Sequence, residues 1–231
     1  MHFDVIVLGG GPAGLGATLA LVRSGAKVAL IDAGPTVGGM STTIRRGDAA
    51  FDLGGHILFV GDGGREAWLR ELLGADLRWV DRPVVSIEGG AITAGRYLDR
   101  RSGDTIGSPP LIPVTDESAA SLLERLFGAV TVDLSMRRYL EKVDGMRLER
   151  ITAQRARKLL VEQYAPEGFW YPANGIGQLM DAMARAVTAG GGTILTRSHV
   201  EAITITDERI DEISVAGLDG RPLTFTTTSL V

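Results

Sequence analysis

The chain opens with the pattern of a strand, a helix and a second strand. Residues 3–8 (FDVIVL) form a short apolar run that stops at glycine and predicts a buried parallel strand. In residues 12–25 apolar positions recur on one helical face, and a glycine is placed to end that helix. Residues 27–31 (KVALI) predict the second strand. This order is one βαβ unit, whose crossover is expected to be right-handed.

The middle of the chain has a different pattern. Residues 34–64 are rich in glycine and are expected to be mainly loops, and residues 82–98 are typical of short strands joined by turns. Four amphipathic stretches predict helices, at residues 65–74, 116–128, 135–143 and 152–164. The contrast with the βαβ start predicts an inserted, mainly helical region on the substrate side.

The last part returns to an α/β pattern. Residues 176–188 predict a helix that ends in a glycine run. From residue 193 onwards apolar and polar residues alternate around the turn signals TDER and LDGR, which predicts a strand followed by antiparallel partners. The chain stops at Val231 in strand-like residues with no closing helix, so we expect a truncated chain or a fragment of a longer protein.

These patterns predict an α/β fold class. The expected architecture is a Rossmann-like, glutathione-reductase-type domain built from both ends of the chain, with the helical region inserted between them. Residues 1–75 are the first part of the dinucleotide-binding domain, residues 76–172 are the insertion, and residues 173–231 are the incomplete second part.

Composition narrows the classes of function. Hydrophobic residues make up 45% of the 231 residues and charged residues 23%, enough for a globular core. The net charge of −4 gives no support to nucleic-acid binding. The absence of cysteine excludes disulfides and thiolate chemistry, and the three histidines show no metal-ligand spacing, so no metal is expected. No apolar run is long enough to span a membrane and no signal peptide is evident, so a cytoplasmic protein is expected.

The first glycine segment fits the dinucleotide-binding fingerprint G-x-G-x-x-G. It follows a predicted strand, opens a predicted helix and precedes an acid at the end of the second strand. Gly9 would allow the tight turn, Gly11 would let the backbone reach a diphosphate, and Gly14 would let helix and strand pack closely. Asp32 would accept hydrogen bonds from a ribose diol. A strand–helix turn without a ligand is the alternative.

Two further glycine pairs decide which dinucleotide is expected. They lie in GPTVGGMST, after Asp32, and in FDLGGH at residues 51–56. A nicotinamide domain would continue into its next strand and helix instead, and no second G-x-G-x-x-G follows. Glycine at the later pair would let backbone N–H groups approach a ring closely. The pattern favours a flavin dinucleotide.

At these motifs the chain resembles a known family. The stretches DVIVLGGGPAGLGATLAL, VALIDAGPTVGGMSTT and FDLGGHILF are similar to FAD-dependent oxidoreductases of the flavin amine oxidase and protoporphyrinogen oxidase superfamily. The form FDLGGH is closest to the branch that includes UDP-galactopyranose mutase-like proteins. The resemblance continues at MRRYLEKVDGMRLERITAQRARKLL and at FWYPANGIGQLMDAMARAVTAGGGTILTRSHVEAI, and so covers most of the chain.

The resemblance implies FAD as the cofactor and assigns its contacts. His56 stays open between a catalytic role and a structural histidine that bonds backbone. The implied FAD-binding residues are Gly9, Gly11, Pro12, Ala13, Gly14 and Asp32 for the adenosine diphosphate half, Gly38, Gly39, Met40 and Ser41 for the diphosphate and ribityl chain, Gly54, Gly55 and His56 beside the isoalloxazine, and Val200 at the adenine. The family's C-terminal flavin motif would lie beyond Val231, so a downstream segment or a partner chain is expected to supply it.

The function implied is FAD-dependent oxidation of a small molecule. A substrate C–H next to nitrogen or oxygen would deliver hydride to flavin N5. One alternative is a redox-neutral, UDP-galactopyranose mutase-like isomerase, in which reduced flavin N5 attacks a sugar carbon. Another is a truncated or partner-dependent flavoprotein without activity of its own.

Four further features stay open. Asp52 is either a turn cap or a site residue, and Trp170 with Tyr171 either lines a cavity or anchors the core. The charged stretches at residues 99–101 and 137–138 are either solvated charge or an anion clamp.

Overall fold

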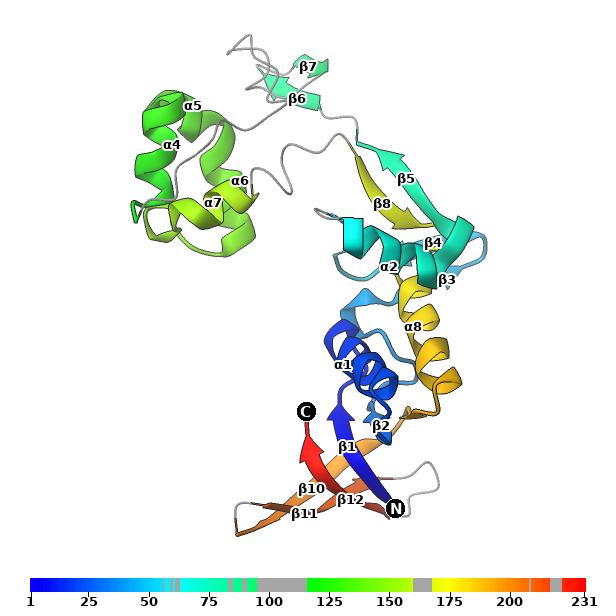
Figure 1. Cartoon of the computed structure of the whole chain (residues 1–231). Coiled ribbons are helices and arrows are strands. Elements are labelled where there is room, and N and C mark those ends of the chain that lie inside the picture. Colours follow the sequence, from blue (N-terminus) through cyan, green and yellow to red (C-terminus); the bar gives the residue numbers. More distant parts are fainter. Residues whose placement is uncertain are drawn as a thin grey trace. The chain divides into compact units, whose positions relative to one another are not determined.

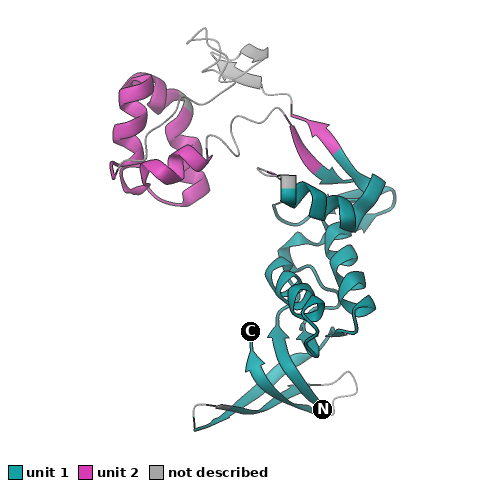
Figure 2. Cartoon of the chain, in the orientation of Figure 1, with its two compact units in different colours: residues 1–58, 63–78, 171–231 teal, residues 59–62, 79–170 magenta. Residues whose placement is uncertain are grey.

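The computed structural model describes residues 1–231 except residues 56, 59, 61–62, 83–84, 89–90, 95–115, 160–167, 208 and 217–221. The chain divides into two compact units (Figure 2). Unit 1 consists of Met1–Leu58, Gly63–Arg78 and Tyr171–Val231, and unit 2 of Phe59–Asp62 and Trp79–Trp170. Among the described residues, no helix combines the length and the apolar character that crossing a membrane requires.

Unit 1 contains a six-stranded sheet, in the order β10-β11-β12-β1-β2-β9 (Figure 1). Strands β12, β1, β2 and β9 run parallel, and β11 and β10 continue the sheet as antiparallel strands beside β12. The bounds are β1 (His2–Leu8), β2 (Val28–Ile31), β9 (Thr193–Leu195), β10 (His199–Thr206), β11 (Arg209–Ala216) and β12 (Pro222–Leu230). The first and last strands of the chain are therefore direct neighbours.

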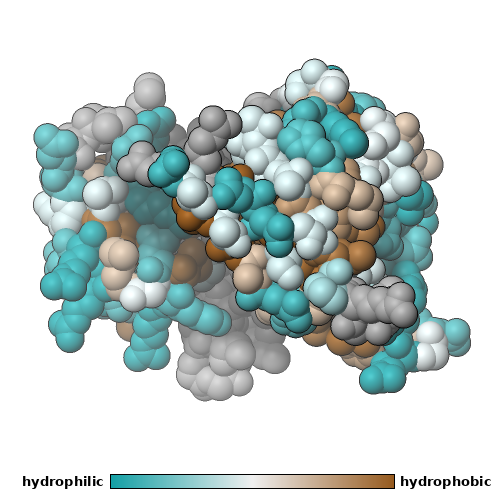
Figure 3. All heavy atoms as spheres, turned by 90° about the horizontal axis from the view of Figure 1, so that it is seen from below, coloured by the Kyte–Doolittle hydropathy of each residue, from teal (hydrophilic) through white to brown (hydrophobic). Residues whose placement is uncertain are grey.

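The apolar runs explain why β1 and β2 lie inside the sheet. All four residues of β2 are buried, and Phe3 and Ile6 of β1 join residues of β11 and β12 in one hydrophobic cluster. The Phe3 and Phe225 rings lie 6.1 Å apart within it. The antiparallel strands leave apolar side chains exposed, with Ile205 64% accessible. On the face drawn in Figure 3, apolar patches lie among hydrophilic ones.

Three helices pack in unit 1. Helix α1 (Pro12–Arg23) contacts α8 (Gly177–Ala189), which in turn contacts α2 (Gly63–Leu73). The predicted apolar face of α1 is buried, and the short 3-10 turn η2 (Gly74–Asp76) follows α2. The βαβ unit of the sequence analysis is confirmed in α1 and its two flanking strands.

A β-hairpin occupies part of the region expected to be loop. After the 3-10 turn η1 (Gly39–Ser41), strand β3 (Thr43–Arg46) pairs antiparallel with β4 (Ala49–Asp52). The two-residue connection Gly47–Asp48 is a hairpin signal that the sequence analysis did not use, and Gly47 takes a φ of +57° there. The prediction of loop was wrong for these eight residues.

Unit 2 contains a small helical core. Buried apolar residues from each of its longer helices form one cluster, including Leu123, Met136, Leu140, Leu148 and Leu159. Its helical elements are α4 (Ala119–Phe127), α5 (Ala129–Thr131), the π-helical turn η3 (Val132–Met136), α6 (Arg137–Asp144), the 3-10 turn η4 (Leu148–Arg150) and α7 (Ala153–Leu159). The helices predicted at residues 116–128, 135–143 and 152–164 correspond to α4, α6 and α7, and residues 160–164 lie outside the described part of the chain.

The described residues also include two pairs of short strands. Strand β5 (Leu77–Asp81) pairs with β8 (Gly168–Pro172), and β6 (Val85–Glu88) pairs with β7 (Ala91–Ala94). The Trp79 and Trp170 rings meet edge to face, with centroids 5.4 Å apart. A side chain at Gly168 would come within 2.5 Å of the Trp79 ring. Trp170 is thus packed against a second tryptophan.

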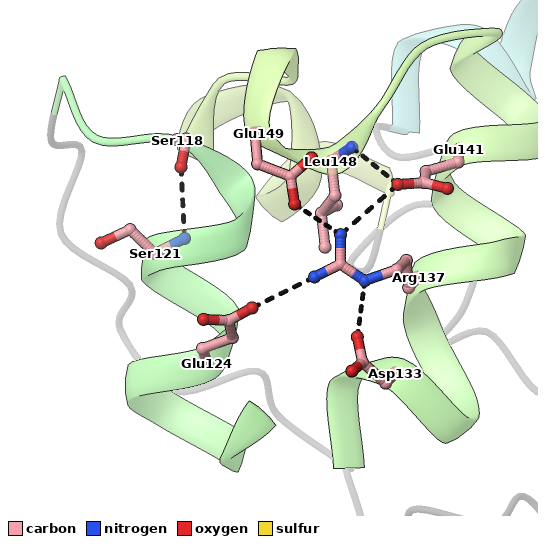
Figure 4. Close-up of polar contacts among 8 residues, drawn as sticks. All are labelled: Ser118, Ser121, Glu124, Asp133, Arg137, Glu141, Leu148 and Glu149. Carbon is pink, nitrogen blue, oxygen red and sulfur yellow. Dashed lines mark hydrogen bonds and ion pairs between the residues drawn. The ribbon is translucent and has the colours of Figure 1, made fainter. Parts of the chain in front are cut away.

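Arg137 ties the helical core of unit 2 together (Figure 4). Its guanidinium lies 2.5 Å from Asp133, 2.7 Å from Glu149, 3.1 Å from Glu124 and 3.5 Å from Glu141. The hydrogen bonds to Asp133 and Glu149 raise the pKa of Arg137 above its ordinary value. Four carboxylates of the same unit contact this cation, so it is neither solvated charge nor available as an anion clamp.

Candidate functional site

The first glycine segment, residues 9–14, joins the end of β1 to the start of α1. Gly9 has a φ of +101°, which a side chain would disfavour. A Cβ atom on Gly14 would lie 1.8 Å from the Gly9 carbonyl oxygen, so the helix approaches the strand as closely as glycine allows. A Cβ atom on Gly11 would meet nothing within 4 Å. Pro12 occupies the first turn of α1, where its missing N–H is not needed.

Asp32 connects this segment to the chain after β2. Its Oδ2 accepts a hydrogen bond from Gly10 N at 2.5 Å, and its Oδ1 accepts one from Gly34 N at 2.7 Å. The Asp32 carbonyl also accepts from Ser198 N, which brings the start of β10 alongside. Each carboxylate oxygen keeps a second lone pair with which a ribose hydroxyl could bond. Val200, farther along β10, is half-buried against the core of the sheet.

The second glycine segment, residues 38–41, lies directly against the first. Gly38 N donates to the Gly10 carbonyl at 2.7 Å, and a Cβ atom on Gly39 would come within 3.4 Å of the Gly11 Cα atom. Ser41 N closes the turn by donating to the Gly38 carbonyl at 2.9 Å. The Met40 side chain is exposed. The two segments thus form one continuous backbone surface.

The third glycine pair, Gly54 and Gly55, extends this surface. A Cβ atom on Gly54 would lie 2.6 Å from the Met40 carbonyl oxygen, whereas one on Gly55 would meet nothing within 4 Å. His56 lies outside the described residues, so its proposed role stays a prediction. The described residues of all three segments form one run of contacts, from the Asp32 carboxylate through the backbone of Gly10 and Met40 to Gly54. We call this run the glycine surface.

Asp52 is the centre of a hydrogen-bond cluster that the sequence analysis left undecided. Tyr171 Oη donates to its Oδ2 at 2.5 Å. Thr43 Oγ1 at 2.6 Å and Ile176 N at 3.1 Å both donate to its Oδ1. Gly177 N in turn donates to Thr43 Oγ1 at 2.8 Å. We call these five groups the Asp52 cluster.

A groove of about 380 Å³ lies on the α8 side of the second glycine segment. Its walls are mainly polar, and Arg45, Asp181 and Arg185 supply the charges. Arg45 donates to the Asn174 carbonyl at 3.0 Å. Nothing in the sequence pattern marked these residues, which come from a hairpin and from a helix far along the chain. In the described parts of the chain, no group of three or more His, Asp or Glu side chains is placed to hold a metal ion.

The phenol of Tyr171 leads to a prediction about pH. Burial, and then the hydrogen bond to Asp52, raise the pKa of Tyr171 from 10.0 to about 12. Because the folded state favours the neutral phenol, this stabilisation is complete below pH 10 and is lost as the pH rises towards 12. The free energy of unfolding, measured in urea at pH 9 and near pH 12, should fall more steeply for the wild type than for Tyr171→Phe. Equal slopes would contradict the prediction.

Comparison with known proteins supports the dinucleotide-binding interpretation. The family model of the NAD(P)-binding Rossmann-like domain matches residues 7–73. A soluble pyridine nucleotide transhydrogenase of Stutzerimonas stutzeri is 54% identical over 41 residues, which are 18% of this chain and 9% of that protein. The match confirms the predicted Rossmann-like fold at the start of the chain.

Two solved structures share the wider fold. Putrescine oxidase, in a structure bound to putrescine, matches with a TM-score of 0.65 and 18% identity over 100% of this chain and 57% of its own. A reduced UDP-galactopyranose mutase matches with a TM-score of 0.63 and 19% identity over 99% of this chain and 55% of its own. The predicted likeness to an amine oxidase and to a UDP-galactopyranose mutase is therefore confirmed for the fold. The chain spans a little over half the length of these structures.

Proposed function

We propose that the chain binds FAD along the glycine surface and forms the cofactor-binding part of an FAD-dependent oxidoreductase. The observation that carries this proposal is the open space beside Gly11 and Gly55. Neither glycine has a positive φ, so backbone conformation does not account for the missing side chain, as it does at Gly9. Open space beside a glycine is expected where a ligand approaches the backbone. Gly14 and Gly54, by contrast, pack directly against protein backbone. This difference supports a ligand contact at Gly11 and Gly55 and a packing role for Gly14 and Gly54.

The residues fit the parts of FAD in order. The first turn of α1 presents the N–H groups of Ala13 and Gly14 and the positive end of the helix dipole to the diphosphate. Asp32 would bond the ribose, and Val200 would lie at the adenine. Gly38, Gly39, Met40 and Ser41 would follow the diphosphate and ribityl chain, and Gly54, Gly55 and His56 would lie beside the ring.

Bound FAD would supply a hydride acceptor for a small substrate whose reacting C–H lies next to nitrogen or oxygen. The chain's own part is to hold the dinucleotide and to place backbone dipoles near its ring. We assign residues 1–75 and 173–231 to cofactor binding and residues 76–172 to the substrate side. The separate hydrophobic core of unit 2 supports this division.

A redox-neutral isomerisation of a sugar nucleotide is the second candidate. The fold match to UDP-galactopyranose mutase supports it. Reduced flavin would be required throughout and no substrate would be oxidised, so anaerobic assays with and without prior reduction separate it from oxidase chemistry. A third candidate is that a downstream segment or partner chain completes the site, which the 57% coverage of putrescine oxidase supports.

Alanine at the two open glycines tests FAD binding. Gly11→Ala and Gly55→Ala should leave the melting temperature of the cofactor-free protein unchanged, because neither new methyl group contacts protein. Each should weaken FAD binding by about tenfold or more, because the methyl group would occupy ligand space. Titration of FAD, followed by its fluorescence, measures the dissociation constant. Wild-type affinity in both variants, or no FAD binding by the wild type, would contradict the proposal.

A further inference from the structure

Asp52 lies two residues before Gly54, the ring-side end of the glycine surface. Among the described residues, three donors to its carboxylate come from three separate segments: Thr43 in the hairpin, Tyr171 in β8 and the Ile176 amide before α8. Two of them share one oxygen, and the third bonds the other oxygen. Hydrogen bonds to an ionised acceptor are among the stronger ones in proteins, so three of them define the position of this carboxylate.

The surroundings leave the Asp52 cluster little freedom. A Cβ atom on Gly175 would lie 2.5 Å from Thr43 Oγ1 and 2.9 Å from Asp52 Oδ1, so the turn before α8 presses directly on both side chains. A Cβ atom on Gly177 would lie 2.8 Å from Thr43 N. Backbone this close to the carboxylate excludes alternative positions of the β4 end.

The chain after Asp52 is held from its other side as well. Leu53 N donates to the Thr42 carbonyl at 3.1 Å, and Gly54 touches the Met40 carbonyl. One residue farther, Gly55 faces open space. The Asp52 cluster and the second glycine segment therefore together set where the Gly55 backbone lies.

We propose that Asp52 is a positioning residue that, through the Asp52 cluster, fixes the Leu53–Gly55 backbone against the flavin ring and thereby tunes the ring's affinity and reduction potential. This inference rests on the proposed function. It assigns to Asp52 and Tyr171, which lie 119 residues apart, a joint role in the redox properties of the site. Asp52 acts on the ring through the backbone that follows it.

The experiment compares FAD with ADP, which carries only the adenosine diphosphate half. Tyr171→Phe removes the hydroxyl that donates to Asp52 and keeps the aromatic side chain. Asp52→Asn removes the negative charge of the carboxylate. Thr188→Val is the control, since it removes an exposed hydroxyl bond on α8. Calorimetric titration gives the affinity for each ligand, and the visible spectrum and reduction potential of bound flavin report on the ring.

The expected result is a loss of about tenfold in FAD affinity with ADP affinity unchanged within about twofold, together with a shifted reduction potential and visible band. Equal losses for FAD and ADP, or a potential and band at wild-type values, would overturn the inference. If Asp52→Asn fails to fold, Tyr171→Phe, which leaves the carboxylate in place, decides alone. If the wild type binds ADP but not FAD, both this inference and the assignment of Gly54 and Gly55 to the flavin ring are overturned. If the wild type binds neither ligand, the proposed function itself is overturned.

Discussion

Replacing Gly14 with alanine is expected to destabilise unit 1 strongly. The new methyl group would lie 1.8 Å from the Gly9 carbonyl oxygen and 3.0 Å from the Gly9 carbonyl carbon. Both atoms belong to backbone, so relief requires moving α1 away from β1. Overpacking of a core costs about 1–3 kcal/mol and sometimes more, and backbone contact this close places Gly14→Ala at or above about 3 kcal/mol. For a chain of this size that lowers the melting temperature by at least about 6 °C.

Gly16→Ala is the matched control for this change. It lies in the same helix, and its Cβ atom would only reach the Met183 side chain, at 3.9 Å. Alanine is the better helix former by about 1 kcal/mol, so this variant should be as stable as the wild type or more so. Thermal unfolding of both variants, followed by circular dichroism, gives the comparison. If Gly14→Ala has the same melting temperature as Gly16→Ala, helix α1 can shift away from the Gly9 carbonyl at little cost, and the prediction is contradicted.

The local parts of the fold could be predicted because they depend on neighbours in sequence. The run FDVIVL is apolar except at Asp4, as a largely buried strand requires, and it became β1. The helix after it was marked by its apolar face and by the glycine at its end. The hairpin β3–β4 was missed because its strands carry exposed apolar and charged side chains without a clean alternation.

The arrangement around Asp52 could not be predicted for a different reason. An acid before a glycine pair is equally compatible with a cap and with a ligand contact. Its partner Tyr171 is 119 residues away, and Ile176 contributes only a backbone amide, which no side-chain pattern identifies. The same limit applied to Arg137, since its contacts with Glu124 and Glu149 depend on how α4 and η4 pack. Such positions are decided by tertiary packing.

Arg137→Met should destabilise the helical core of unit 2 by about 2 kcal/mol. Exposed ion pairs contribute about 0–1 kcal/mol, whereas removing one partner from a buried pair costs about 3–5 kcal/mol. The Arg137 side chain is 23% exposed, which places it between these cases. Methionine keeps much of the apolar stem of the side chain, so the loss of stability measures the contribution of the guanidinium group. Four carboxylates would then lie close together without their shared cation.

The matched control is Arg125→Met in the neighbouring helix α4. Arg125 is 53% exposed and pairs with Glu117, so the same substitution should change the free energy of unfolding by less than about 1 kcal/mol. Urea unfolding followed by far-ultraviolet circular dichroism measures both variants. Equal effects of the two substitutions would mean that the carboxylate cluster around Arg137 is no more important than an ordinary surface pair.

The pH dependence of the unfolding free energy distinguishes an electrostatic role of Arg137 from a loss of packing. A hydrogen bond from its own backbone amide, and then the bond from Arg137, lower the pKa of Glu149 below 4.5. The corresponding stabilisation is present above pH 4.5 and is lost as the pH falls through the lowered value. In Arg137→Met the carboxylates repel one another, so protonation relieves the variant while it weakens the wild type. The gap in unfolding free energy should therefore close as the pH falls below 4.5, whereas a gap caused by packing alone would persist.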